Sequence, residues 1–209
     1  MQTAIKYIKT LQRLKNKHIL SLVLCMCFIF SYASGQTGRL NSNKYIPDTT
    51  VNFVLQLLNP ASIRKAIGSQ AGKMIQDEKP TRVQLTNKSG KEYLILYHSS
   101  GSNVNSFSEF EVGLIKSPDK SFKPSKFVTF FTECGIHLGM TMDSLIALKG
   151  KQFLKTAINS QTVLTYKIEE NEKGGKPDIL MRYNMPEYKA EYHFINFRLV
   201  KFVFGFPEP

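Results

Sequence analysis

The chain has 209 residues, with 28 Lys and Arg against 16 Asp and Glu, and 42% of its residues are hydrophobic. This apolar content is enough for a folded core and excludes a disordered or collagen-like chain. Three cysteines are too few for a small scaffold held together by disulfides. The length predicts one domain or two small ones.

Residues 1–35 have the pattern of a secretory signal peptide: basic residues without any acid, then an apolar run, then small residues. The apolar run, Ile19–Tyr32, would cover about 21 Å as a helix, which is less than the ~30 Å hydrocarbon core of a membrane. We expect cleavage between Gly35 and Gln36, with the bond after Ala33 as the alternative. Retention of this segment as an uncleaved membrane anchor stays open. The basic residues are Lys6, Lys9, Arg13, Lys15 and Lys17.

Part of the basic excess therefore belongs to the signal peptide. The remaining lysines are scattered along the chain, which is typical of a solvated surface and not of a nucleic-acid-binding patch. We expect no nucleic acid partner, while a weak attraction to anionic envelope surfaces stays open. Cys134 is the single cysteine after residue 35, so an exported chain would depend on its core and not on an internal disulfide.

The clearest helix signal covers residues 141–149. Thr141 is suited to cap the N-terminus, Asp143 lies in the first turn, where the helix dipole favours an acid, and Gly150 ends the helix. Leu145 and Leu148 are spaced to share one buried face. A helix this short is not stable alone, so it must pack on another element.

The residues after this helix predict a sheet. Alternation of apolar and polar residues indicates strands at 161–169, 188–194 and 198–206, and it continues through Ile179, Met181 and Tyr183. Short turns between these segments predict an antiparallel meander with one half-buried face.

The first half has the same order of elements. Asn59 and Gly68 bracket a short helix, as Thr141 and Gly150 do at an offset of 82 residues. Strand signals follow at 82–87, 92–98, 107–115 and 126–133. We therefore expect an α+β protein with two tandem units, each a short helix with an antiparallel sheet. The boundaries are a signal peptide at 1–35, a flexible lead-in at 36–50, and units at 51–132 and 133–209.

One segment of the second half carries a resemblance to known proteins. Gly135, Gly139, Met140 and Thr141 form a G-x-x-x-G-M-T pattern that leads into the helix ending at Gly150. This segment resembles the signature of the β-lactamase-inhibitor-protein-like fold, which small outer-membrane assembly lipoproteins share. The resemblance implies a binding or scaffolding module that acts through its sheet surface without catalysis. The chain lacks the anchoring cysteine of those lipoproteins and has no Trp, so inhibition of a β-lactamase is not implied.

Few residues suggest chemistry. Cys134 and His137 are three apart and, with His98 or His193, would supply three metal ligands. A buried Cys beside a histidine at a strand end is the favoured interpretation, and a Cys–His nucleophilic pair is disfavoured because one strand seldom aims both side chains at one atom. We therefore expect that the protein is not an enzyme and that it binds neither a metal nor a cofactor. An enzyme with an unrecognised site would need one of these histidines to meet a carboxylate in a pocket.

Aromatic residues crowd the last strands. Most of them are expected in the core under the helix, but residues 198–206 are apolar on both faces, so one face must meet a second layer or a partner. The function expected from the sequence is an exported, non-catalytic binding or assembly module of the bacterial envelope, in the periplasm or at the cell surface, whose partner is an envelope protein. A small-ligand carrier is the alternative. The candidate interaction surface comprises Tyr183, Tyr188, Tyr192, Phe202 and Phe204.

Overall fold

The computed structural model describes residues 45–68, 82–98, 106–116, 121–158, 160–170 and 175–207. All of them belong to one compact unit, Ser42–Pro209. The predicted signal peptide and the cleavage site at Gly35 and Gln36 lie outside the described residues. Within the described ranges, no helix has the length and apolar character needed to cross a membrane.

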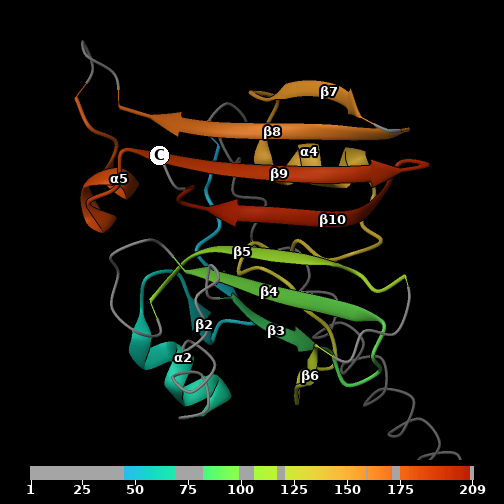
Figure 1. Cartoon of the computed structure of the whole chain (residues 1–209). Coiled ribbons are helices and arrows are strands. Elements are labelled where there is room, and N and C mark those ends of the chain that lie inside the picture. Colours follow the sequence, from blue (N-terminus) through green and yellow to red (C-terminus); the bar gives the residue numbers. More distant parts are fainter. Residues whose placement is uncertain are drawn as a thin grey trace, which may run out of the picture. The chain divides into compact units, whose positions relative to one another are not determined.

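One antiparallel sheet of eight strands dominates the fold (Figure 1). Its order is β6-β3-β4-β5-β10-β9-β8-β7, and every pair is antiparallel except β3 with β6. A two-stranded hairpin, β1-β2, precedes it. In chain order the elements are β1 (Thr50–Val51), β2 (Leu55–Gln56), α2 (Pro60–Ile67), β3 (Arg82–Thr86), β4 (Glu92–His98), β5 (Phe107–Leu114), β6 (Lys123–Pro124), α4 (Met142–Lys149), β7 (Leu154–Ile158), β8 (Gln161–Glu169), α5 (Asp178–Tyr183), β9 (Glu187–Ile195) and β10 (Arg198–Gly205). The α+β class is therefore confirmed.

Of the described helices, the two longer ones are those that the sequence predicts. The Asn59 side chain caps α2 by accepting from the Ser62 backbone N–H at 3.1 Å, and the Thr141 hydroxyl does the same for α4 with the Ser144 backbone N–H at 3.1 Å. Both helices end at a glycine with φ of 82°, a conformation that other residues rarely adopt.

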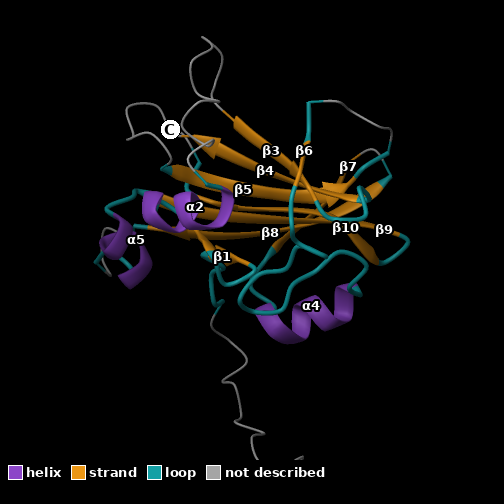
Figure 2. Cartoon of the chain, turned by 90° about the horizontal axis from the view of Figure 1, so that it is seen from below, coloured by secondary structure: helices purple, strands orange, loops and turns teal. Residues whose placement is uncertain are grey.

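All three helices in the described ranges pack against the same buried cluster. Ile63 of α2, Leu145 of α4 and Leu180 of α5 belong to the cluster that also holds Phe110 of β5 and Phe202 of β10. Figure 2 shows α4 on one side of the sheet, and in Figure 1 it lies behind β8 and β9. The core therefore lies on one face of the sheet, beneath the helices.

One strand prediction in the second half is wrong, and the alternation predicted for another strand is interrupted. Ile179, Met181 and Tyr183 lie in α5, where Asp178 occupies the favourable first turn and Asn184 ends the helix in the left-handed conformation. In β10 an irregularity in the pairing between Leu199 and Lys201 breaks the alternation. Leu199 is therefore buried in the same cluster as Phe202.

The first half also differs from expectation in two segments. Residues 126–133, predicted as a strand, form an irregular loop in which the Phe130 side chain is buried. The short strand β6 lies just before this loop. The last residues of the predicted flexible lead-in are part of the folded unit, because Tyr45 and Asp48 are buried. Asp48 pairs with Lys149 of α4, so residues 45–50 are held against the core.

Candidate binding face

The face of the sheet opposite the core carries ordered polar side chains. Strand register places them in rows that run across β4, β5, β10, β9 and β8. We call this the open face and define it by three rows. The first row is Tyr93, Gly113, Lys201, His193 and Val163; the second is Ile95, Glu111, Val203, Glu191 and Thr165; the third is Tyr97, Glu109, Gly205, Lys189 and Lys167.

Two tyrosines of β4 are fixed on one carboxylate of β5. The hydroxyl of Tyr93 donates to Oε1 of Glu111 at 2.6 Å, and the hydroxyl of Tyr97 donates to Oε2 at 3.1 Å. Burial, together with the hydrogen bond and charge of Glu111, raises the pKa of both tyrosines above the usual value, so both remain protonated donors at neutral pH. The ring of Tyr93 lies over Gly113, where a Cβ atom would approach the ring to 2.5 Å.

Acids and bases alternate along β9. Lys189 Nζ lies 2.8 Å from Glu191 Oε1, and His193 Nε2 lies 3.6 Å from Glu191 Oε2. The contacts with His193, and then with Lys189, lower the pKa of Glu191 to about 2. Burial raises the pKa of Glu109, and its acidic neighbours Glu111 and Glu191 raise it further. The face thus carries both signs of charge at short range.

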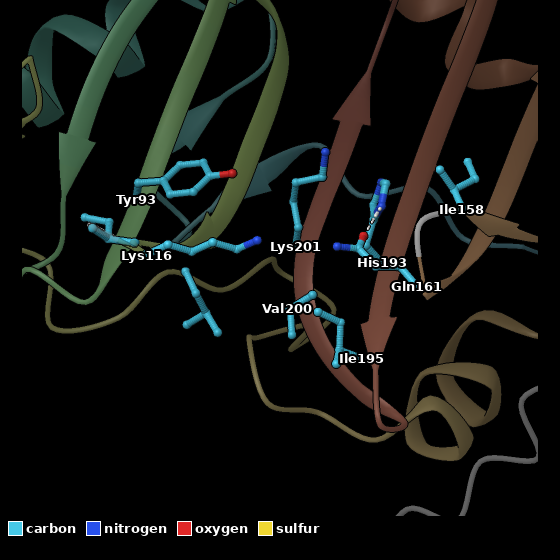
Figure 3. A pocket seen from close by; sticks show the side chains of 10 residues that line it. Tyr93, Lys116, Ile158, Gln161, His193, Ile195, Val200 and Lys201 are labelled. Carbon is cyan, nitrogen blue, oxygen red and sulfur yellow. Dashed lines mark hydrogen bonds between the residues drawn. The ribbon is translucent and has the colours of Figure 1, made fainter. Parts of the chain in front are cut away.

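A groove of about 590 Å³ opens on this face beside the first row (Figure 3). Its volume lies within the range of about 300–1,000 Å³ typical of small-molecule sites. It is lined by Tyr93, Leu114, Ile115, Lys116, Ile158, Gln161, His193, Ile195, Val200 and Lys201. A smaller hollow of about 230 Å³ adjoins it through Lys201, and this hollow is lined by Glu109, Glu111 and Glu191 among others.

The candidate surface predicted from the aromatics is wrong in its placement. Four of these residues are fully buried: Tyr188, Tyr192, Phe202 and Phe204. The fifth, Tyr183 of α5, is half-buried, and its ring packs against Phe206. Their inward position follows from the strand alternation, since these residues share the face that the helices cover. Tyr188 and Tyr192 instead hold Asp48: the Tyr188 hydroxyl donates to its backbone carbonyl at 2.8 Å, and the Tyr192 hydroxyl donates to Oδ2 at 2.8 Å.

Cys134 and His137 do not converge. Burial, and then the negative charge of nearby Asp48, raise the pKa of the Cys134 thiol to about 11. The His137 ring is exposed, and its Nδ1 contacts the Gly135 carbonyl at 2.9 Å. His98 packs on Phe107 at the end of β4, and His193 lies on the open face. In the part of the chain that the structure describes, no three His, Cys, Asp or Glu residues are grouped to hold a metal ion.

The aromatic pattern of the sequence does not identify the open-face residues, because the aromatic residues of β9 and β10 lie in the core. One signal was available: in β5 the apolar residues Phe110 and Val112 alternate with Glu109 and Glu111, so the acids had to occupy the other face. The chain matches no protein-family model, no curated protein and no solved structure.

Proposed function

We propose that the chain is an exported, non-catalytic binding or assembly module of the bacterial envelope that recognises its partner through the open face. The observation that carries this proposal is the asymmetry of the sheet. The core, to which all three described helices contribute, lies on one face, and the other face carries rows of tyrosine and charged side chains beside a groove. No described helix covers this face, and a face with such side chains is suited to recognition.

The side chains of the open face are held in place before any partner binds. Tyr93 and Tyr97 share Glu111, and Lys189 is paired with Glu191. Side chains that are already ordered lose less conformational entropy on binding. Tyrosine also contributes a large contact area, and each of these hydroxyls, which already donates to Glu111, can still accept a hydrogen bond from a partner.

The finer fold assignment is part of the same proposal. We infer two tandem helix-plus-sheet units with a β-lactamase-inhibitor-protein-like arrangement. This is supported by the matching caps of α2 and α4, and by β5 and β10, the last long strands of the two halves, which pair antiparallel. Duplication that joins two small sheets through their last strands would create one wide face from two narrow ones.

Export is supported by the sequence pattern of residues 1–35. Cell fractionation and N-terminal sequencing of the recovered protein test this step. Export with cleavage predicts recovery from the periplasm or cell surface with an N-terminus at Gln36 or nearby. Recovery from the cytosol with an intact N-terminus would contradict it.

Affinity capture from envelope extract tests the binding function. The tagged chain is compared with a double variant of the open face, Lys189→Glu and Tyr97→Ala, and with a control on the helical side, Asp143→Lys in α4. All three target residues lie outside the buried cluster. The proposal predicts that a protein is enriched by the wild type and the control but lost with the open-face variant. Equal enrichment by all three chains, or none by the wild type, would contradict it.

The groove favours a second candidate function, a carrier of a small ligand. Its volume and its mixed lining are those of a small-molecule site. Both candidates place recognition on the same face, and they differ in what is bound there.

A further inference from the structure

The groove combines an apolar lining with a polar rim. Leu114, Ile158 and Ile195 line it, and they are 44%, 52% and 36% exposed. Clustered exposed apolar side chains mark a binding site more often than scattered ones do. Val200, at the irregularity of β10, and Ile115, after the end of β5, complete this lining.

The rim has donors and positive charge. Lys116 extends from the end of β5 toward β10, and Lys201 lies on β10 (Figure 3). The lining contains no Asp or Glu among the described residues. The nearest acidic cluster lines the smaller hollow, and only Lys201 is shared between the two. Lys116 therefore gives the groove a positive charge that no acid among its described lining residues offsets.

Gln161 contributes an oriented donor. Its Oε1 lies 3.2 Å from His193 Nδ1, and with Oε1 as the acceptor this ring nitrogen carries the hydrogen. The carboxamide N–H₂ group then points into the groove, toward the side on which Lys116 lies (Figure 3). His193 thus positions the amide, and Gln161 and Lys116 face the same space from two sides.

We infer that this groove binds a single-chain amphiphile with an anionic head, the head between Lys116 and Gln161 and the chain against Val200, Ile195 and Ile158. A carboxylate and a phosphate head share the chemistry that these donors recognise. The inference rests on the second candidate function, the small-ligand carrier, and names the class of ligand that the groove would hold.

Binding is measured by isothermal titration calorimetry, with protein purified after expression of all 209 residues. The probes are dodecanoate, dodecyl phosphate and neutral monolauroyl glycerol, each below its critical micelle concentration. The inference predicts that at least one anionic probe binds at least about tenfold more tightly than the neutral one, as expected for one charge-assisted contact. The two anionic probes separate a fatty-acid-like ligand from a phosphorylated one. Shortening the chain by two methylenes weakens binding by up to about tenfold.

Three variants locate the site. Lys116→Gln lowers the affinity for the anionic probe by about tenfold and leaves that for the neutral probe unchanged. Ile158→Ser lowers the affinity for both. The control, Lys123→Gln, removes an exposed lysine from β6 at the far edge of the sheet and changes neither.

Three results would overturn the inference: no binding of either anionic probe, equal affinity for anionic and neutral probes, or an equal effect of Lys116→Gln and Lys123→Gln. Failure of this inference is distinguishable from failure of the proposed function. If the groove binds no amphiphile but envelope capture still depends on Lys189 and Tyr97, the open face remains the protein-recognition surface and only the carrier function is contradicted.

Discussion

Asp48 and Lys149 form an ion pair that is completely shielded from solvent. Lys149 Nζ lies 2.7 Å from Asp48 Oδ2, and both side chains have no exposed surface. Nζ also donates to the Ile46 carbonyl at 2.7 Å and lies 5.5 Å from the centre of the Tyr45 ring. The pair joins the segment before β1 to the end of α4, which are about a hundred residues apart in sequence.

Lys149→Met should destabilise the protein by about 3–5 kcal/mol, because it leaves the Asp48 carboxylate buried and unpaired. The double variant Asp48→Asn/Lys149→Met should recover most of this loss, since no unpaired charge is then buried. Urea unfolding of the single and the double variant, compared with the wild type, measures both changes in the free energy of unfolding. A loss below about 1 kcal/mol for the single variant would show that residues 45–50 are not docked on the core.

The hairpin between β9 and β10 contains a phenylalanine in an unfavourable backbone conformation. Asn196 and Phe197 have φ of 48° and 60°, as a two-residue type I′ turn requires, and the second position of such a turn favours glycine. Phe197 is 75% exposed, so its ring contributes little to the core. Phe197→Gly should therefore raise the free energy of unfolding by about 1 kcal/mol.

Phe53 is the matched control for this prediction. It has φ of 58° in the turn between β1 and β2, but its ring also packs edge-on against Phe131 at 5.7 Å. Phe53→Gly should raise the free energy of unfolding by less than Phe197→Gly does, because the contact between the Phe53 and Phe131 rings is lost. Thermal unfolding compares the two variants, and destabilisation by Phe197→Gly would refute the turn geometry.

Gly113 makes room for the ring of Tyr93. A Cβ atom at this position would lie 2.5 Å from the Tyr93 ring, and displacement of the ring would break its bond to Glu111. Gly113→Ala should cost about 1–3 kcal/mol. In a Tyr93→Ala background the same substitution should cost almost nothing, and a double-mutant cycle measures the difference. Equal costs in both backgrounds would mean that the ring does not lie over Gly113.

Glu109 and Glu191 should respond to pH in opposite ways. The pKa of Glu109 is raised, so its ionised form destabilises the fold above the ordinary glutamate value near 4.5. Glu109→Gln should therefore stabilise the protein at pH 7, and the gain should vanish at pH 3.

The pKa of Glu191 is lowered to about 2, so its carboxylate stabilises the fold above pH 4.5, and this contribution is lost as the pH falls toward 2. Glu191→Gln should destabilise the protein at pH 7 and have less effect near pH 2. Urea unfolding across this pH range measures both variants. If both substitutions changed the free energy of unfolding in the same direction at pH 7, the opposite pKa shifts of Glu109 and Glu191 would be contradicted.

The helices and most strands could be predicted because their signals are local. Thr141 and Gly150 bracket α4 in the sequence as they do in the structure, and alternation in β8 and β9 identifies the buried face. The helix α5 could not be recognised, since its six residues also fit a strand pattern and its stability depends on packing Leu180 into the core.

The candidate site depended on long-range relationships. Nothing near Asp48 in the sequence indicates that Lys149 and two tyrosines of β9 surround it. The rows of the open face arise from the register between β5 and β10, which no local pattern specifies. Aromatic content alone was misleading, because in these strands it marks the core.

Recognition through the open face is the central claim, and site-specific photo-crosslinking in cells tests it most directly. A photoreactive residue is placed at Tyr97 or Lys189 on the open face, and at Lys65 on the exposed surface of α2 as the control. The account predicts a discrete crosslinked protein species from the first two positions and none from Lys65. Crosslinking from Lys65 alone, or no crosslink from either open-face position, would contradict it.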